Sequence, residues 1–293
     1  MPQSFIARLT DRGVVSVMGP DSGRLLQGLI TNDIGLVVSQ PAIHAGLLSP
    51  QGKILFEFLV VRAHDGFLLD VARDRAADLV KRLLLYKLRA HVEICDVSSE
   101  YAVLAEWGEK PAPGAAPWFA DPRLEALGSR AIVPAVSVPP TIEAASALET
   151  DAEAYHAHRI GLGVPEGGMD YAFADAFPHE ALFDQLNGVS LTKGCYVGQE
   201  IVSRMEHRGT ARSRIVPVVA QSGLPQPGTK IMAGGVAIGA LGSTAGARGL
   251  ALLRLDRAAE ARETGLALTA AETPIEIQMP AWARFTLAPA SSA

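Results

Sequence analysis

The sequence predicts an α+β fold in which antiparallel sheets and helices are followed by a small C-terminal β-barrel. Strand-like runs alternate with helix-like runs in the first two thirds of the chain, and hairpin-type turns join the strands. After Arg214 the pattern changes to short strand-like runs separated by glycine and proline, which is typical of a small barrel. Neither pattern favours a doubly wound parallel sheet.

The N-terminal part combines a predicted sheet with two predicted helices. The segment Pro50-Gln51-Gly52-Lys53 is a good hairpin turn between two strands. Ala76, Leu79, Leu83 and Tyr86 recur at helical spacing and predict an inward-facing stripe. The predicted strands are Val14–Val17, Ala45–Ser49, Ile54–Arg62, Phe67–Val71, Val92–Val97 and Tyr101–Glu106, and the predicted helices are Asp21–Ile30 and Asp74–Leu88.

The middle of the chain is read as loops around a short strand and two helices. We expect a loop over residues 108–118, a strand at Ala131–Pro134 and a break at Val138-Pro139-Pro140. Thr150-Asp151-Ala152-Glu153 has the pattern of a capping box, and Gly161 and Gly163 end the helix that it opens. Val197, Ile201 and Met205 form one stripe of a further helix.

The barrel strands complete a division into three modules. The strand-like runs are Ile215–Ala220, Thr229–Ala233, Val236–Ser243, Gly249–Leu255 and Ile275–Met279. The expected modules are an α+β module over residues 1–110, a second α+β module over 111–214, and the barrel module over 215–293.

The composition is that of an ordinary globular protein. The chain has 293 residues, 48% of them hydrophobic, and a net charge of −5, which argues against a nucleic-acid footprint over the whole surface. No apolar run reaches the ~18 residues of a membrane span. The N-terminal segment has neither the apolar core of a secretory signal nor the composition of a transit peptide. We therefore expect a cytoplasmic monomer without direct nucleic-acid or membrane partners.

The segment Lys193-Gly194-Cys195-Tyr196-Val197-Gly198-Gln199-Glu200 carries the clearest chemistry. We expect Cys195 near the N-terminus of the helix, where unpaired N–H groups and the neighbouring Lys193 favour a thiolate and make the thiol reactive. The alternative reading of a lone cysteine is a small buried hydrophobe. Gly194 and Gly198 remove side chains that would keep another group from the backbone.

The same segment resembles the hallmark of the YgfZ family of folate-binding proteins. Further matches occur in the same order along the chain: Gly19-Pro20-Asp21, Leu26–Asp33, Leu47–Ile54, Asp121-Pro122-Arg123 with Gly128 and Arg130, Arg159-Ile160-Gly161, and Pro178, Glu180 and Leu182. The resemblance covers residues 19–215 and is weaker beyond. This family is related to the glycine cleavage T-protein and is implicated in the maturation of iron–sulfur enzymes.

The resemblance implies a fold and a ligand. It implies a T-protein-like folate-binding fold with a central cavity, in which the cofactor is tetrahydrofolate or a one-carbon derivative. Cys195 is the candidate reactive thiol, with Lys193 beside it. The candidate cofactor-binding residues are Gly194, Tyr196, Gly198, Gln199, Glu200, Arg204, Glu180, Asp121, Arg123 and Asn32. Arg204 also heads a basic helix exit that suits a polyanion such as a folate glutamate tail, or is simply a solvated helix end.

The two cysteines restrict the role in iron–sulfur chemistry. A cluster normally needs four thiolates or close substitutes, whereas this chain has Cys95 and Cys195 and no Cys-x-x-Cys. The chain must act as a helper, as a transient one-thiol ligand, or as part of a shared site. His156 and His158 are two residues apart, and we interpret them as surface helix residues rather than metal ligands. No metal site is expected.

Three classes of function follow. The first is a folate-binding accessory factor for iron–sulfur enzymes, with assembly proteins or client enzymes as partners and an indirect effect on tRNA modification. The second is an aminomethyl or one-carbon transferase of the T-protein type. Leu55 and Phe56 stand where the T-protein has two aspartates, so we expect no such catalysis, although Glu57 lies nearby. The third is a non-catalytic RNA- or protein-binding module.

Overall fold

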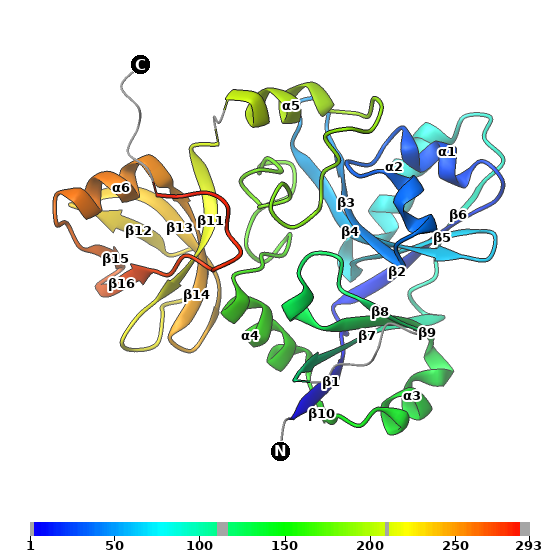
Figure 1. Cartoon of the computed structure of the whole chain (residues 1–293), viewed down its shortest axis with the longest axis horizontal. Helices are drawn as coiled ribbons and strands as arrows, with labels where there is room; N and C mark the ends of the chain where they lie inside the picture. The colour runs from blue at the N-terminus through cyan, green and yellow to red at the C-terminus, as the bar shows by residue number, and fades with distance from the viewer. Residues whose placement is uncertain (1–2, 110–116, 209–210, 288–293) are drawn as a thin grey trace. The chain divides into compact units, whose positions relative to one another are not determined.

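The computed structural model describes residues 3–109, 117–208 and 211–287, and its chain divides into two compact units. Unit 1 comprises residues 1–155 and 186–199, and unit 2 comprises residues 156–185 and 200–293. Figure 1 shows the course of the chain. Among the residues described, no helix has the length and apolar character needed to cross a membrane.

Unit 1 contains two five-stranded sheets. The first has the order β3-β4-β5-β2-β6 and is antiparallel throughout. Its strands are β2 (Arg12–Met18), β3 (Ala42–Leu48), β4 (Ile54–Ala63), β5 (Gly66–Ala72) and β6 (Glu93–Asp96). The predicted hairpin turn joins β3 to β4, and Gly52 adopts a positive φ of 78° there, which suits glycine. These strands confirm the predicted antiparallel sheet.

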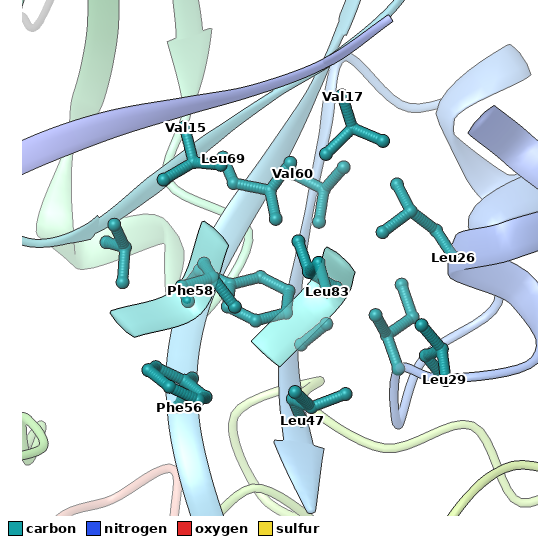
Figure 2. Packing of buried hydrophobic residues seen from close by; sticks show 14 of the residues in the cluster. Val15, Val17, Leu26, Leu29, Leu47, Phe56, Phe58, Val60, Leu69 and Leu83 are labelled. Atoms are coloured by element: carbon teal, nitrogen blue, oxygen red, sulfur yellow. The ribbon is translucent and has the colours of Figure 1, made fainter. Parts of the chain in front are cut away.

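Helices cover one face of this sheet and bury the main core. Figure 2 shows Phe56, Phe58 and Leu47 of the sheet packed with Leu26, Leu29 and Leu83. The helices are α1 (Ser22–Gln27), the 3-10 turn η1 (Ile34–Val38) and α2 (Ala76–Lys87), which follows the short turn η2 (Arg73–Arg75). Ala76, Leu79 and Leu83 are buried as the helical spacing predicts.

The second sheet of unit 1 has the order β10-β1-β7-β9-β8. Its strands are β1 (Ser4–Arg8), β7 (Tyr101–Gly108), β8 (Trp118–Ala120), β9 (Ser129–Pro134) and β10 (Leu148–Thr150), and only the pairing of β1 with β10 is parallel. The module boundary expected at residue 110 falls between β7 and β9, which are neighbours in this one sheet. The loop expected over 108–118 lies largely outside the described residues.

Unit 2 is built on a closed barrel with the strand order β11-β14-β13-β12-β15-β16. The strands are β11 (Ser213–Val219), β12 (Lys230–Ala233), β13 (Val236–Ala245), β14 (Arg248–Arg254), β15 (Leu268–Ala270) and β16 (Thr273–Ile277). A helix that the sequence pattern did not predict, α6 (Leu255–Glu263), packs on the barrel core through Ala258 and Ala261. The small C-terminal barrel is thereby confirmed.

Three helices complete the chain, and two of them correct predictions. The break expected at residues 138–140 is wrong, because Pro139 lies in the first turn of α3 (Val138–Ala144), where a missing N–H costs no helical hydrogen bond. The helix α4 (Ala152–Leu162) is capped by Asp151, whose Oδ1 accepts from the N–H of Ala154 at 2.9 Å. The helix α5 (Gln199–Arg208) begins at Gln199, later than expected.

Candidate functional site

The cysteine segment is an exposed loop rather than the first turn of a helix. Cys195 is exposed, and α5 begins four residues later, at Gln199. The prediction places Cys195 near the N-terminus of a helix, and the structure places it in the loop that precedes the helix, outside its first turn. The prediction that Cys195 is accessible to a reactant is compatible with this exposure, whereas the alternative of a buried hydrophobe is not.

Lys193 anchors this loop to the turn that follows α1. Its Nζ donates hydrogen bonds to the backbone carbonyls of Gln27, Ile30 and Asn32 at 2.8, 2.7 and 2.7 Å. Burial lowers the pKa of Lys193 to about 8, against an opposing effect of the Asp33 carboxylate. The three N–H donors of the ammonium group therefore each have a carbonyl acceptor. We assign Lys193 to holding the loop in place rather than to activating the thiol.

The glycines and the tyrosine of the segment have different roles. Gly198 has a φ of 82°, and a Cβ built on it would lie 2.6 Å from the Ser49 carbonyl oxygen, so the backbone approach predicted for this glycine is real. A Cβ on Gly194 would meet nothing within 4 Å. Tyr196 is buried, which raises its pKa to about 12, and its ring centroid lies 5.2 Å from Lys193 Nζ.

A cavity of about 590 Å³ lies in unit 1 beside this anchored turn. It is lined by the turn around Asn32 and Leu36, by residues 40–44, by residues 120–122 and by residues 187–192. Its volume falls within the range of small-molecule sites, about 300–1,000 Å³. Amide side chains of Asn32, Gln40 and Asn187 line it together with apolar Ile43 and Val189.

The cavity wall and the cysteine loop share Asn32. The side-chain amide of Asn32 donates to the carbonyls of His44 and Asn187, both at 2.8 Å, while the backbone carbonyl of Asn32 accepts from Lys193 Nζ. The neighbouring Thr31 hydroxyl donates to the Gly188 carbonyl at 2.6 Å. The sequence resemblance named Asn32 as a cofactor-binding residue, and the structure places it where the two features meet.

A buried histidine–carboxylate pair also borders the cavity. His44 Nδ1 lies 2.9 Å from the Leu186 carbonyl oxygen, and Nε2 lies 3.1 Å from Glu57 Oε1. A carbonyl oxygen only accepts hydrogen bonds, so Nδ1 carries a proton. With the proton on Nδ1, Nε2 of a neutral imidazole is an acceptor, and a carboxylate oxygen is an acceptor too. A hydrogen bond between Nε2 and Glu57 therefore requires a second proton on one of the two groups. The sequence analysis did not identify His44, because its two partners lie on other segments.

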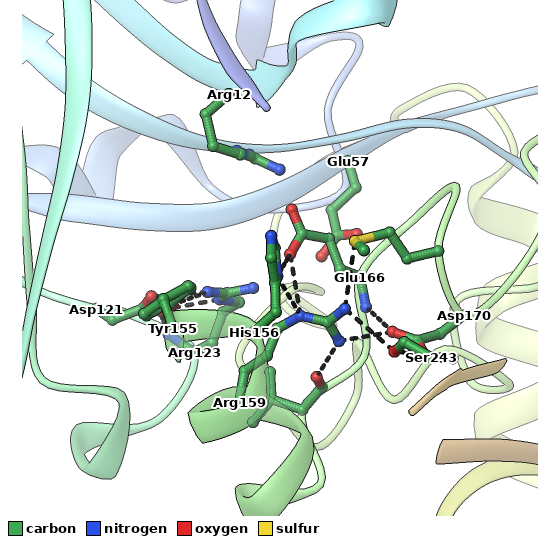
Figure 3. Close-up of polar contacts among 12 residues, drawn as sticks. Arg12, Glu57, Asp121, Arg123, Tyr155, His156, Arg159, Glu166, Asp170 and Ser243 are labelled. Carbon is green, nitrogen blue, oxygen red and sulfur yellow. Dashed lines mark hydrogen bonds and ion pairs between the residues drawn. The ribbon is translucent and has the colours of Figure 1, made fainter. Parts of the chain in front are cut away.

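Asp121 lines the cavity, but its carboxylate belongs together with Arg123 to a buried ion network. The Asp121 carboxylate accepts from Arg123 at 3.0 and 2.8 Å and from Arg130 Nε at 3.0 Å (Figure 3). Both arginines also donate to the Tyr155 hydroxyl, and Arg130 reaches Asp70 at 2.6 Å. The two guanidinium groups hold the pKa of Asp121 well below its usual range despite its burial. The motif is therefore explained by packing.

The other candidates do not line this cavity. Glu180 Oε2 accepts from the N–H of Phe177 at 2.9 Å, which closes a local turn. Glu200 and Arg204 form an exposed pair one helical turn apart, 3.0 Å between Oε1 and Nη2. Gln199 is the first residue of α5 and is half-buried. The prediction that these side chains bind a cofactor remains untested by the cavity geometry.

Cys95 differs from Cys195 in exposure and in neighbours. Cys95 lies in β6, is half-buried and donates to Glu93 Oε1 across 3.6 Å. Burial and the Glu93 carboxylate raise the pKa of Cys95. A raised pKa lowers the thiolate fraction of Cys95 at neutral pH.

Two polar clusters of unit 2 are accounted for by packing. Arg159 is fully buried and donates to Asp170 at 2.7 Å and to Ser243 at 3.2 Å (Figure 3). It also contacts His156, which is mostly buried, so the expectation of a surface position for that histidine is wrong. This network explains the Arg159-Ile160-Gly161 match.

The second cluster of unit 2 has the donor types of a metal site. Ligand atoms of His179, Asp184 and Glu206 lie within 4.8 Å of one another. However, Arg214 donates to both oxygens of Asp184 at 2.8 and 2.9 Å. A guanidinium group already neutralises this carboxylate, so we assign no metal centre to the cluster.

Comparison with known proteins defines the class first. The domain described as "CAF17, C-terminal beta-barrel domain" matches residues 212–285. The crystal structure of glycine cleavage system aminomethyltransferase T from Bartonella henselae superimposes with a TM-score of 0.73, covering 96% of this chain and 86% of that one at 14% identity. At that identity the likeness shows the fold alone, which is a T-protein-like fold with a C-terminal barrel.

Sequence relatives then define the family. The human protein named "Iron-sulfur cluster assembly factor IBA57, mitochondrial" is 34% identical over 275 residues, with 84% of this chain and 76% of that protein covered. The Mycosarcoma maydis homolog is 36% identical over 239 residues. The chain belongs to the IBA57 family of iron–sulfur cluster assembly factors, with which the predicted YgfZ resemblance is broadly consistent.

The relatives differ from this chain in length, and their names give a location. The chain spans only 53–59% of the length of three fungal members of the family. The fungal and human relatives are named as mitochondrial proteins. This finding contradicts the cytoplasmic localisation expected from the N-terminal sequence.

Proposed function

We propose that this protein binds a reduced folate in the unit 1 cavity and supports iron–sulfur enzymes by presenting Cys195 to a partner. The observation that carries the proposal is the shared position of Asn32, which forms part of the cavity wall and accepts a hydrogen bond from the lysine that anchors the cysteine loop. The cavity and the loop that carries Cys195 thereby share one continuous segment of the chain.

The cavity residues fit a flat heteroaromatic group. A pterin presents donors and acceptors along one edge, and amide side chains offer both. Gln40 lines the cavity and is exposed, so it can turn toward a ligand. Asn187 is also exposed, and its Nδ2 donates to the Pro122 carbonyl at 3.0 Å, which leaves its Oδ1 to accept from a ligand. Val189 and Leu191 line the cavity and are not buried, so they provide apolar surface for the ring faces. The Asp121 carboxylate is not counted among these groups, because two arginines occupy it.

The role of Cys195 is that of a single ligand. A thiol that loses its proton can donate one sulfur electron pair to an iron of a cluster, while a partner protein supplies the remaining ligands. The exposed loop allows a partner to approach this sulfur. Support of cluster-dependent enzymes that modify tRNA would follow indirectly, without contact between this chain and tRNA.

The transferase alternative has less support. In the place of the two T-protein aspartates, Phe56 is buried in the core and Leu55 is partly buried against it. Neither residue can transfer a proton. Purified protein should therefore release no methylenetetrahydrofolate from an aminomethyl-lipoyl carrier, and robust release would replace the accessory role with the transferase role.

The binding test is calorimetric titration of the full chain with tetrahydrofolate. We expect saturable binding that Leu191→Trp abolishes, because Leu191 lines the cavity and is exposed enough to accept a larger side chain without unfolding the chain. Leu148→Trp is the matched control, since Leu148 is similarly exposed and lies away from the cavity lining. Absence of binding to the unmodified chain would contradict the folate proposal.

A further inference from the structure

The second helix of unit 1 exposes an apolar stripe that its own fold does not cover. Leu84 and Leu85 lie in the last turn of α2 and are exposed, unlike the buried Leu79 and Leu83, and the exposed Leu88 follows directly as the residue that caps the helix. Leu85 is 68% exposed and Leu88 is 88% exposed. Single exposed leucines are common, but three on one stripe indicate a contact surface.

The same stripe is surrounded by positive charge. Residues 73–89 carry six Lys and Arg and two Asp, a local charge of +4 in a chain whose net charge is −5. Both aspartates lie in the N-terminal half of this stretch. Lys87 and Arg89 lie at its C-terminal end and form no ion pair with any described residue. Charges that remain unpaired beside apolar surface favour an anionic partner.

A pocket of about 400 Å³ opens beside Leu88. Leu25, Leu29 and Tyr86 supply apolar lining, and Arg24, Lys87 and Arg89 supply cations. Asp21 also lines the pocket, but its Oδ2 accepts from the N–H of His91 at 2.8 Å. A concave apolar pocket within a basic rim suits one anchoring side chain flanked by carboxylates.

The backbone at Leu88 is strained in a way that keeps this leucine exposed. Leu88 caps α2 with φ 44° and ψ −109°, a conformation for which glycine is the usual residue. A bulky residue in such a conformation is costly and is characteristic of functional positions. The side chain at this position is therefore better explained by contact than by folding.

We propose that this surface, formed by Leu84, Leu85, Leu88, Lys87 and Arg89 with the adjoining pocket, docks an acidic segment of a partner protein. An apolar side chain of the partner enters the pocket, and its carboxylates pair with Lys87, Arg89 and Arg24. Gly28 and Leu29 line the pocket, and the carbonyls of Gln27 and Ile30 on either side of them accept from Lys193. The docked partner thus contacts the same turn that anchors the cysteine loop.

The binding test uses a synthetic helical peptide with one phenylalanine flanked by glutamates, measured by fluorescence anisotropy against the full chain. We expect saturable binding that weakens as ionic strength rises. The double variant Lys87→Glu/Arg89→Glu should weaken binding by about tenfold or more. Val136→Ser is the matched control, since Val136 is 87% exposed elsewhere in unit 1 and should leave binding unchanged.

Leu88→Gly separates docking from folding. Glycine relieves the backbone strain, so the thermal unfolding midpoint should stay the same or rise, while peptide affinity falls about tenfold. Failure of the acidic peptide to bind, or unchanged affinity in both variants, would overturn the proposal. Tighter binding to phosphatidylserine–phosphatidylcholine vesicles than to the peptide would overturn it in favour of a lipid surface.

A cellular measurement distinguishes this proposal from the proposed function. In a deletion strain, Leu88→Gly should lower the activity of cluster-dependent enzymes, although the purified variant still binds tetrahydrofolate and its Cys195 is alkylated at the normal rate. Full complementation by Leu88→Gly would contradict the docking surface while leaving the folate and thiol roles intact.

Discussion

The segment around Asp121 and the segment around Cys195 support the same family resemblance but differ in what their polar groups do. Asp121, Arg123 and Arg130 bind one another and are buried. Cys195 lies in a loop that is anchored at Lys193 and Gly198 and whose sulfur is exposed. The comparison shows that charged residues of a motif can bind one another in the interior, whereas the exposed Cys195 is the group to which we propose a functional role.

The largest effect should come from the structural segment. Arg130→Ala removes one of the two arginine partners of Asp70 and of Asp121, so it should lower the free energy of unfolding by about 3–5 kcal/mol in urea titrations. Arg257→Ala is the control, because its pair with Glu260 is exposed and should contribute about 1 kcal/mol or less. A loss below about 1 kcal/mol for Arg130→Ala would mean that the network is not the scaffold described here.

Substitution of Lys193 should cause the second-largest loss of unfolding free energy. Lys193→Met leaves three backbone carbonyls without their donor and should cost about 2–3 kcal/mol. Faster proteolysis of the loop should accompany the loss. Unchanged stability would show that water replaces the ammonium group at no cost, and that the anchor is not needed.

The same lysine predicts a pH dependence with a definite sign. Its pKa is lowered to about 8 in the folded chain from 10.5 when unperturbed, so between these values the unfolded state binds more protons and stability rises with pH. The difference in unfolding free energy between the unmodified chain and Lys193→Met should therefore grow from about pH 7 to about pH 9.5. Tyr196, whose pKa is raised to about 12, is present in both proteins and cancels. A difference that shrinks over this range would contradict the assignment.

The two glycines of the cysteine loop should give the smallest stability effects and the cleanest contrast. Gly198→Ala places a methyl group against the Ser49 carbonyl at a positive φ and should cost about 1–2 kcal/mol. Gly194→Ala meets open space and should be nearly neutral. Thermal unfolding of the pair measures both. Equal costs would indicate that the close approach at Gly198 is not a constraint.

Much of the fold could be predicted from the sequence because it depends on local patterns. The hairpin around Gly52, the inward stripe of α2 and the glycine-separated strands of the barrel all have short-range signals. The sequence pattern gave a wrong prediction where one residue type is compatible with two local structures. A proline ends a helix or occupies its first turn, and Pro139 does the latter.

The candidate site was predictable only in part, for a related reason. Cys195 is exposed and Asn32 lies in a cavity wall, while the roles predicted for these two residues stay predictions. The partners of Lys193 and His44 lie on distant segments, so neither the anchor nor the buried pair has a local signal. Distant partners also decide that Asp121 is structural.

The most direct test of the central claim is complementation of a deletion strain with Cys195→Ala and, in parallel, Cys95→Ala. Both variants should fold with less than about 1 kcal/mol lost, since one exposed or half-buried sulfur contributes little. Cys195→Ala should fail to restore the activity of cluster-dependent enzymes, and Cys95→Ala should restore it. Full complementation by Cys195→Ala would show that the exposed sulfur is dispensable and would contradict the proposed role of the loop.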